Sequence, residues 1–409
     1  MIALIPFRFV HMADCHLDAP YATKNESIRK ILLNAAYTSF RRAVALALAE
    51  GAHAFLIAGD LFDENYLSFR GETLLMEELG RLVDAGVQVV YGTGNHDYGG
   101  PDSKARSLPW PNIVIIDDAF QLVEVQSDGR LVGVVGGAGH NGPKVMENLA
   151  ATFPKLSYSV PTVGLLHCQV ASSLAPEEPY APCTKGDLQN KGYDYWALGH
   201  IHKPQRVLEA PLAHYSGSLI GNNPKEEGPR GVLLVELTKD YGRVKFCPTA
   251  PVQWLRLTPD LRDVRSFEDL FRVLRGLVPK DAENLLVRVE FAGPSPLSKE
   301  LGRMAGEPDQ WLELGEEIRR ETGALGVELK LGTLTGSLDP QEYKHAPHVL
   351  AEALSIYEEL QQDPQRTLEL LPVLAGEREG FVNEENKAQY LAQLLDNLDQ
   401  DLALKMVKE

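Results

Sequence analysis

The sequence predicts an α/β fold in which a large domain with two sheets precedes a small α+β domain and a helical C-terminal region. Strand-like and helix-like segments alternate over residues 8–91, which is the pattern of a parallel sheet covered by helices. Short strand-like segments then follow one another over residues 112–248, and these require a second sheet. Beyond residue 250 the pattern changes again. We therefore expect domains at residues 1–250, 251–339 and 340–409.

The first part of the chain supplies three buried strands and two helices. Residues 8–13, 53–58 and 87–91 are apolar and rich in β-branched or aromatic side chains, as expected of strands that are covered on both faces. Residues 25–49 and 69–85 carry apolar side chains at a spacing of three and four, which predicts amphipathic helices. The order strand, helix, strand, helix, strand favours parallel pairing.

Further strands are predicted from shorter segments separated by turn residues, and together with the first three strands they imply two sheets. Ser127, Asp128 and Gly129 form a hairpin signal between two of these segments. The predicted strands lie at residues 113–116, 120–125, 131–135, 162–166, 193–198, 214–218, 231–237 and 244–248.

The remaining chain predicts a small mixed domain followed by helices. Ser266 precedes a helix with acidic residues in its first turn, which is a capping signature. Strands are expected at 285–291 and 327–331, and helices at 308–322, 346–360 and 384–406. A leucine stripe in the last helix favours packing within the chain, with docking of a partner protein as the alternative. Its members are Leu391, Leu394, Leu395, Leu398, Leu402 and Leu404.

Composition predicts a cytoplasmic protein of more than one domain. A chain of 409 residues exceeds one ordinary core, and its 44% hydrophobic and 24% charged residues are typical of globular proteins. The sequence contains neither an apolar run long enough to cross a membrane nor a secretory signal. Four cysteines without C-x-x-C spacing argue against a disulfide framework or a structural zinc site.

The net charge of −17 weakens a nucleic-acid hypothesis without excluding it. Residues 1–250 hold 27 acidic and 22 basic side chains, whereas residues 251–409 hold 30 and 18. Most of the excess therefore lies outside the first domain, and bound divalent cations would offset part of the remainder.

Five predicted strand ends carry side chains that are typical metal ligands. Open α/β sheets place their ligand sites at the carboxyl ends of strands, so these side chains are expected to meet. In Asp14-x-His16 and His200-x-His202, the alternation of an extended chain would point both side chains the same way. Carboxylate and imidazole ligands together suit manganese, iron or zinc better than calcium. The set is Asp14, His16, Asp60, Asn95, His167, His200 and His202.

Each of these motifs taken alone has an ordinary structural explanation. Gly94-Asn95-His96-Asp97 is compatible with a polar turn, and a single histidine after an apolar strand is usually a packed, hydrogen-bonded side chain. Cys15, which lies between two proposed ligands, is expected to face away from them. The full set in one order favours a metal centre. His140 remains open, as a turn residue or as part of the cleft.

The order of these motifs resembles the calcineurin-like metallophosphoesterase superfamily over roughly the first 250 residues. The resemblance implies a four-layer αββα sandwich of two mixed sheets and two divalent ions. It implies that Asp14, His16 and His202 hold one ion, that Asn95, His167 and His200 hold the other, and that Asp60 bridges them. His96 would contact the phosphate or protonate the leaving oxygen, with Asp97 as its orienting partner.

Further stretches resemble the DNA-repair exonuclease branch, of the SbcD and YhaO type. They are Gly59-Asp60-Leu61-Phe62-Asp63, Tyr195 to His202, Tyr215-Ser216-Gly217-Ser218, Tyr180 to Cys183 and Gly228 to Gly231. The resemblance implies a manganese-dependent DNA exonuclease, with single-strand endonuclease activity as an addition. The alternatives are a phosphodiesterase or phosphatase acting on cyclic nucleotides, nucleotides or phosphoproteins, and a non-catalytic scaffold.

The partners implied by this resemblance are DNA and an SMC-like coiled-coil ATPase, and a homodimer is left open. The sequence contains no Gly-x-x-x-x-Gly-Lys-[Ser/Thr] motif, so any dependence on ATP requires a partner. No membrane association is expected.

Overall fold

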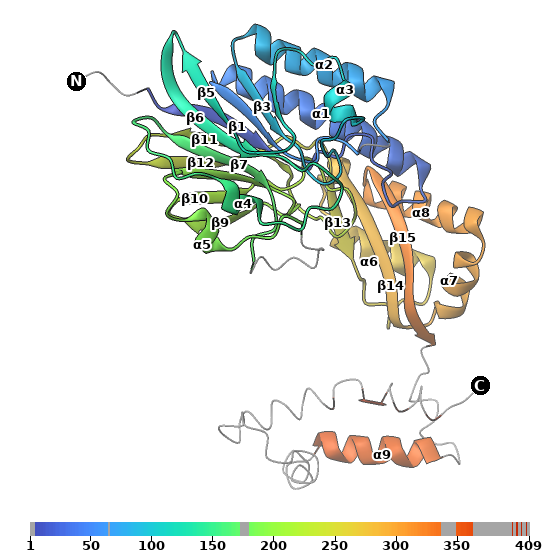
Figure 1. The fold of residues 1–409 in the computed structure, drawn as a ribbon. Coiled ribbons are helices and arrows are strands. Elements are labelled where there is room, and N and C mark those ends of the chain that lie inside the picture. The colour runs from blue at the N-terminus through green and yellow to red at the C-terminus, as the bar shows by residue number, and fades with distance from the viewer. Residues whose placement is uncertain are drawn as a thin grey trace. The chain divides into compact units, whose positions relative to one another are not determined.

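The computed structural model describes residues 5–63, 66–171, 180–336 and 349–362, together with residues 395, 398, 399, 402 and 406 (Figure 1). The chain divides into two compact units. The first comprises Met1–Arg256 with the short segments Glu283–Arg288 and Ala324–Gly326, and the second comprises the rest.

The first sheet of the first unit has six strands in the order β12-β11-β1-β2-β3-β4. Strands β1 to β4 are parallel, and β11 pairs antiparallel with both β1 and β12. Their bounds are Phe7–Met12 (β1), Ala54–Ala58 (β2), Gln88–Gly92 (β3), Val114–Ile116 (β4), Gly231–Leu237 (β11) and Gly242–Pro248 (β12).

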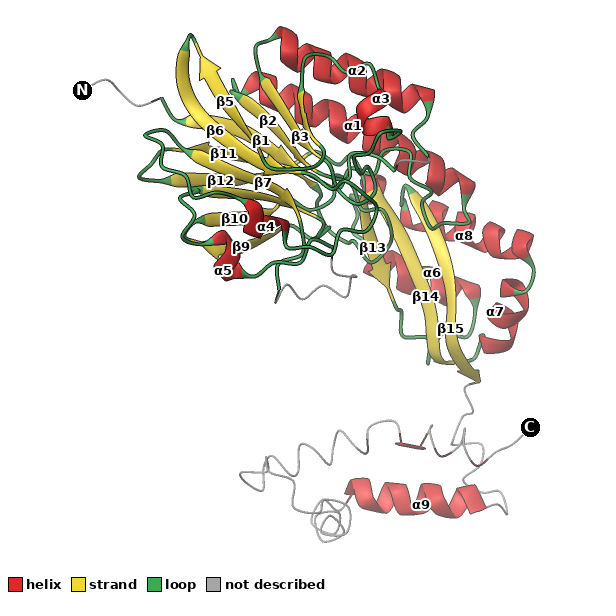
Figure 2. Cartoon of the chain, in the orientation of Figure 1, coloured by secondary structure: helices red, strands yellow, loops and turns green. Residues whose placement is uncertain are grey.

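Helices α1 (Glu26–Ala49) and α2 (Phe69–Asp84) cover the outer face of this sheet (Figure 2). Each begins at a side-chain cap, because Asn25 accepts a hydrogen bond from Ile28 N and Ser68 accepts one from Gly71 N. Their buried apolar faces pack on the sheet in one core with residues such as Val10.

The second sheet has the order β5-β6-β7-β8-β10-β9 and also mixes directions. Asp128 and Gly129 both have positive φ, which allows the tight turn between β5 and β6. The strands are Gln121–Ser127 (β5), Arg130–Ala138 (β6), Thr162–His167 (β7), Tyr195–Gly199 (β8), Gln205–Glu209 (β9) and Leu212–Tyr215 (β10). Short helices lie at Lys104–Ser107 (α3), Leu149–Thr152 (α4) and Lys185–Leu188 (α5).

Apolar side chains from both sheets form the core between them. Phe9 and Leu56 of the first sheet pack with Val135, Leu165 and Tyr195 of the second. A further core, which includes α4 and α5, covers the outer face of the second sheet. The predicted α/β class with two mixed sheets is confirmed. The parallel strands β1, β2, β3, β7 and β8 end at the loops that carry the proposed ligands.

A third sheet has the order β13-β14-β15, with strands Gln253–Leu257, Leu285–Ser295 and Gly326–Gly336. Its helical neighbours in sequence are α6 (Phe267–Leu277), η1 (Ala282–Asn284), α7 (Ser298–Ala305) and α8 (Pro308–Thr322). The expected cap of α6 is present, since Ser266 accepts a hydrogen bond from Asp269 N. Sequence patterns missed β9, β13 and α7, which are short and rich in charged or polar residues.

Helix α9 (Val349–Gln362) overlaps the helix predicted at residues 346–360. Leu350 and Leu354 are buried and pack against Leu402 and Met406. Leu402 of the leucine stripe is therefore used for packing within the chain. Leu391, Leu394 and Leu404 of that stripe, and also His345 and His348, lie outside the described residues. No helix among the described residues is long and apolar enough to span a bilayer.

Candidate metal centre

The loops that follow five parallel strands bring the seven predicted ligands into one centre. Asp14 and His16 follow β1, Asp60 follows β2 and Asn95 follows β3, whereas His167 ends β7 and His200 and His202 follow β8. The first sheet and the second sheet therefore each contribute. All except His202 are buried, with at most 9% of the residue exposed.

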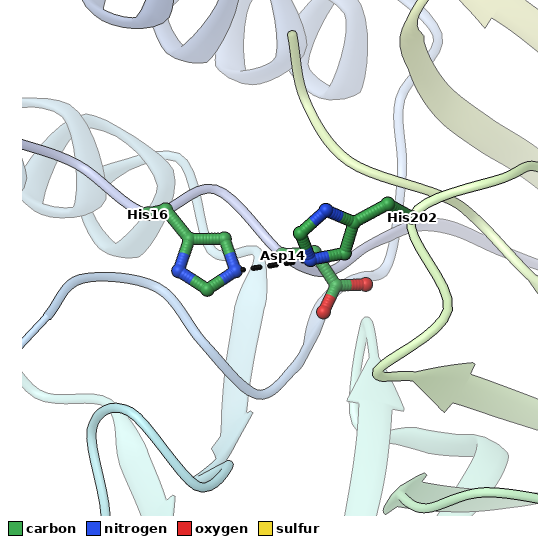
Figure 3. Close-up of side chains that lie close together, drawn as sticks. All are labelled: Asp14, His16 and His202. Atoms are coloured by element: carbon green, nitrogen blue, oxygen red, sulfur yellow. Dashed lines mark hydrogen bonds between the residues drawn. The ribbon is translucent and has the colours of Figure 1, made fainter. Parts of the chain in front are cut away.

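Asp14, His16 and His202 form what we call the first cluster (Figure 3). One ligand atom from each lies within 4.8 Å of the others. The Nε2 atoms of His16 and His202 are 3.2 Å apart. Two imidazole nitrogens bound to one ion at about 2.1 Å each would be separated by about 3.0 to 3.4 Å, so this spacing fits a shared cation.

A carboxylate supports each histidine of the first cluster from behind. His16 Nδ1 lies 2.9 Å from Asp63 Oδ1, and His202 Nδ1 lies 3.0 Å from Glu226 Oε1. A proton on Nδ1 that is donated to a carboxylate leaves the Nε2 lone pair free for a metal. Sequence patterns assigned no such role to Asp63 or Glu226, because both contacts join segments that are distant in the chain.

Asn95, His167 and His200 form the second cluster. His167 Nε2 lies 3.0 Å from Asn95 Oδ1, and the rings of His167 and His200 are 5.4 Å apart. His167 Nδ1 lies 2.9 Å from the backbone oxygen of Ala58, which fixes the same Nδ1–H tautomer without a carboxylate.

Glycines make room for the His167 ring. A Cβ on Gly59 would lie 2.7 Å from His167 Cγ, and one on Gly199 would lie 2.8 Å from His167 Nδ1. Real Cβ atoms essentially never approach so closely. Gly59 also has φ of +84°, which favours glycine on backbone grounds. The turn after β2 and the end of β8 are thus shaped around this histidine.

Asp60 lies between the two clusters. Its Oδ2 is 3.7 Å from His16 Nε2 and 3.4 Å from His167 Nε2, and its Oδ1 accepts a hydrogen bond of 2.9 Å from His96 N. Asp14, Asp60 and His167 also form a group of convergent donor atoms. This is the placement that a ligand shared by two ions requires.

The backbone at four of the proposed ligands is not extended, in contrast to the prediction from the sequence. Asp14, His16, Asp60 and His200 have φ values of +51°, +44°, +52° and +102°. The two motifs are therefore not extended, and alternation along a strand is not what brings their side chains together. Non-glycine residues with positive φ are costly and concentrate at functional sites, where surrounding structure enforces them.

His96 is the exposed member of the centre, with 47% of its side chain accessible. Its Nδ1 lies 3.0 Å from Asp63 Oδ1, the oxygen that also contacts His16. The structure thus gives Asp63, rather than Asp97, the direct contact expected of an orienting partner.

Asp97 is fully buried and accepts four hydrogen bonds. The donors are Asp60 N at 3.2 Å, Leu61 N at 2.6 Å, Gly94 N at 2.6 Å and the Tyr91 hydroxyl at 2.5 Å. The Asp97 carboxylate therefore ties the Asp60 loop to the Asn95 loop. A catalytic role for Asp97 stays a prediction.

His140 belongs to the buried surroundings of the second cluster. It is fully buried, and its Nε2 lies 2.8 Å from the backbone oxygen of His167. Its ring packs edge-on against His167 at 5.4 Å. His140 therefore lies in a loop, as a turn residue would, but its side chain is buried beside the second cluster.

Burial and charge separate the pKa values in the centre. The hydrogen bond to Asp63 raises the pKa of His96 to about 9, although burial acts in the opposite direction. Burial lowers the pKa of His202, but its hydrogen bond to Glu226 and the field of Asp14 outweigh this effect and raise that pKa to about 9. Burial lowers the pKa of His167 to about 3. The pKa of His167 is thus shifted in the opposite direction from those of His96 and His202.

Burial raises the pKa of Asp14 to about 6 and, with the field of Asp60, that of Asp97 to about 7. It acts on Asp60 in the same sense, but the surrounding histidines outweigh it and hold the pKa of Asp60 below its usual range. Asp14, Asp60 and Asp97 are buried close together, and bound cations would offset the cost of their negative charge.

Comparison with known proteins agrees with this geometry. Residues 7–204 match the calcineurin-like phosphoesterase family. An uncharacterized metallophosphoesterase YhaO of Bacillus subtilis is 30% identical over 327 residues, covering 78% of this chain and 79% of that protein. The chain belongs to the calcineurin-like metallophosphoesterases. It is therefore a metal-dependent phosphoesterase, a hydrolase of a family that uses a dimetal centre.

A DNA double-strand break repair protein Mre11 of Aeropyrum pernix is 28% identical over 423 residues, covering 90% of this chain and 96% of that protein. Among solved structures, a dimetal phosphatase from Danio rerio covers 58% of this chain and 95% of its own, with 12% identity and a TM-score of 0.39. The similarity to the phosphatase structure is too low to support the family assignment.

Proposed function

We propose that this metallophosphoesterase is a manganese-dependent DNA exonuclease that also cuts single strands internally, and that it acts in DNA repair. The observation that carries the proposal is the similarity to Mre11, which extends over 90% of this chain and so continues beyond the phosphoesterase domain. The shared part includes the region after residue 250, where we propose a capping domain at residues 251–339 and a helical region at 340–409.

The proposed ligands form two sets. Asp14, His16 and His202 would hold one ion, Asn95, His167 and His200 would hold the other, and Asp60 would bridge them. The donor set fits such ions, because it joins carboxylates, imidazoles and one amide oxygen at spacings near 3 Å. Bound divalent ions would polarise a phosphate oxygen and favour ionisation of an attacking water.

The chain's own residues supply the proton and its orientation. His96 stands on the accessible side of buried ligands, which is where a phosphodiester would approach. Its Nδ1 is held by Asp63, so its Nε2 is available to contact the phosphate or to protonate the leaving oxygen. The hydrogen bond to Asp63 raises the pKa of His96, which favours the protonated form that an acid requires.

The acidic composition supports a second candidate, a phosphodiesterase acting on cyclic nucleotides or other small phosphoesters. A DNA complex requires many Lys and Arg contacts to phosphates, and the net charge is −17. An SMC-like coiled-coil ATPase partner, a homodimer and cytoplasmic location belong to the leading proposal.

A substrate panel with purified protein tests the proposal. Linear double-stranded DNA, single-stranded circles, a cyclic dinucleotide and bis-p-nitrophenyl phosphate would each be offered with manganese, zinc or iron. We expect rapid digestion of linear DNA with manganese and loss of it in His200→Ala. His53→Ala, at the opposite end of β2 from Asp60, is the matched control. Cleavage of the cyclic dinucleotide alone would favour the second candidate, and full DNA digestion by His200→Ala would refute the metal centre.

A further inference from the structure

Glu226 lies in the loop between β10 and β11, and four polar groups contact its carboxylate. Three of them belong to the same loop, and the fourth is the His202 ring. Its Oε1 lies 3.0 Å from His202 Nδ1 and 2.7 Å from Asn223 Nδ2. Its Oε2 accepts hydrogen bonds from Ser218 Oγ at 3.0 Å and from Asn222 N at 3.1 Å. Asn223, Ser218 and Asn222 all donate, so the side chain acts as an acceptor on both oxygens, as an ionised carboxylate does.

We propose that Glu226 is a positioning residue of the first cluster, which fixes the Nδ1–H tautomer of His202 and so presents Nε2 to an ion. This rests on the proposed function in one respect, because it takes His202 as a metal ligand. A carboxylate behind a ligating imidazole fixes the ring's orientation and makes the imidazole a more basic ligand. His202 Nε2 already faces His16 Nε2 across 3.2 Å.

The same loop also fixes the backbone of His202. Arg230 is buried, and its Nη1 donates to the backbone oxygen of His202 and to Ser218 Oγ. Ser218 N donates to that backbone oxygen at 3.0 Å. Hydrogen bonds therefore hold His202 at its ring, through Glu226, and at its backbone oxygen, through Arg230 and Ser218.

A rigid anchor holds the loop in place. The indole Nε1 of Trp254 donates to the backbone oxygen of Gly221 at 2.9 Å, and Trp254 is buried. A Cβ on Gly221 would lie 2.9 Å from Trp254 Cδ1, so the ring packs directly on this glycine. These contacts of Trp254 restrict the loop, so the hydrogen bond between Glu226 and His202 keeps a fixed geometry.

The competing explanation is that Glu226 only shapes its own loop through Ser218, Asn222 and Asn223. Glu226→Gln removes the charge and turns an amide NH₂ group toward one of the two pairs of partners. In either orientation the amide NH₂ would face donors, namely His202 and Asn223 on one side or Ser218 and Asn222 on the other. The variant therefore loses either the hydrogen bonds to His202 and Asn223 or those to Ser218 and Asn222. It loses the negative charge in both cases.

The experiment is a titration of metal-free protein with Mn²⁺, in which the free ion is measured by electron paramagnetic resonance. We expect Glu226→Gln to bind one of two ions about 10-fold to 100-fold more weakly and to leave the other unchanged. Glu226→Asp keeps the charge but withdraws from His202, and a smaller loss is expected. The matched control is Glu227→Gln, an exposed neighbour whose carboxylate accepts from Arg256 N at 2.7 Å.

A double-mutant cycle with His202→Gln decides the mechanism. If Glu226 acts through His202, adding Glu226→Gln to His202→Gln weakens Mn²⁺ binding no further. Additive losses, or wild-type affinity in both Glu226 variants while His202→Gln loses one ion, would overturn the inference and leave the proposed function standing. Retention of both ions by His202→Gln would instead refute the ligand assignment. A lower melting temperature with unchanged Mn²⁺ affinity would assign Glu226 a loop role alone.

Discussion

The first and second clusters hold their histidines in different ways. In the first, carboxylates stand behind His16 and His202, as Asp63 and Glu226 do at 2.9 and 3.0 Å. In the second, His167 donates to a backbone oxygen and is packed between glycines at which a Cβ would collide with it. One half of the centre is therefore fixed by charged side chains and the other by the path of the main chain.

The difference shows how each half should respond to mutation. Removing a supporting carboxylate alters charge and ring orientation but adds no steric clash, so its effect should appear in ion affinity and catalysis. Changing a glycine behind His167 alters space, so its effect should appear in the position of the ligand itself. The two halves can be perturbed separately, and each perturbation has its own signature.

The largest effect is expected from Asp63→Ala, because one oxygen of Asp63 contacts both His16 and His96. Loss of this contact removes the support of a ligand and the orientation of the proposed acid. The turnover number for bis-p-nitrophenyl phosphate should fall by about 100-fold or more, the range for general acid catalysis. Steady-state kinetics at saturating Mn²⁺ measures this.

Asp102→Ala, at an exposed loop carboxylate, provides the control for Asp63→Ala. When His96→Ala is already present, Asp63→Ala should cause a much smaller further loss in turnover. The acid that Asp63 would orient is then already missing. Normal turnover by Asp63→Ala, beside an inactive His96→Ala, would contradict the role of Asp63.

The next effect tests the half that is built by the main chain. Gly59→Ala places a Cβ 2.7 Å from His167 Cγ at a φ of +84°. We expect affinity for one Mn²⁺ to fall by about 10-fold to 100-fold, as when the support of a ligand is lost. The first cluster should keep its ion, which the same resonance titration reports.

Gly86→Ala separates crowding from backbone strain in the Gly59 experiment. Gly86 has a similar φ of +78°, but a Cβ there meets nothing within 4 Å. Its alanine variant should lose about 1 kcal/mol of stability and no ion affinity. Equal loss of Mn²⁺ in both variants would show that strain, and not contact with His167, is responsible.

The same contrast explains what sequence patterns could predict. Strands β1, β2, β3, β7 and β8 were predictable because buried parallel strands are continuous apolar runs. Ligands at their ends followed from that arrangement and from the family resemblance. The positive φ values of Asp14, His16 and His200 were not predictable, since tertiary contacts enforce them.

The supporting residues were harder to find than the ligands. Glu226 reaches His202 from a loop 24 residues further along the chain, and no local pattern marks that contact. Asp63 follows Asp60 by three residues within a recognised motif, so it could be noticed, but its two partners could not be known. The position of His140 was left open between a turn and the cleft, because its contact with the backbone oxygen of His167 joins segments 27 residues apart.

A smaller effect is expected from Asp97→Asn, which weakens the link between the two clusters. The buried carboxylate accepts three backbone N–H groups and the Tyr91 hydroxyl, and an amide would turn a donor toward some of them. The free energy of unfolding should fall by about 1 to 3 kcal/mol, the cost of leaving a buried polar group unsatisfied. Urea denaturation of the EDTA-treated protein measures it.

Tyr91→Phe removes only one of the four bonds to Asp97 and should cost about 1 kcal/mol. If Asp97→Asn retained wild-type stability while its turnover collapsed, the catalytic role predicted for Asp97 would replace the structural one. Loss of stability with near-normal turnover in the folded fraction supports its role as a link between loops.

The smallest effect concerns His11, which resembles His167 in being buried with one ring nitrogen close to a backbone oxygen. Its Nε2 lies 3.2 Å from the backbone oxygen of Leu198 and its Nδ1 lies 3.0 Å from the Tyr195 hydroxyl. Burial, reinforced by the field of His214, lowers the pKa of His11 from 6.5 to about 3. The folded protein therefore holds His11 neutral, whereas the unfolded chain takes up a proton below pH of about 6.5.

This contribution of His11 is fully present above pH of about 6.5 and is lost as the pH falls toward 3, by at most about 1.4 kcal/mol per pH unit. His11→Gln should flatten the decline in unfolding free energy between pH 6.5 and 4, whether or not EDTA is present, since His11 touches neither cluster. His53→Gln, at a half-exposed histidine, should flatten it less. An unchanged slope in His11→Gln would show that burial without a carboxylate does not keep a histidine neutral in this fold, and the contrast between the two clusters would lose its electrostatic basis.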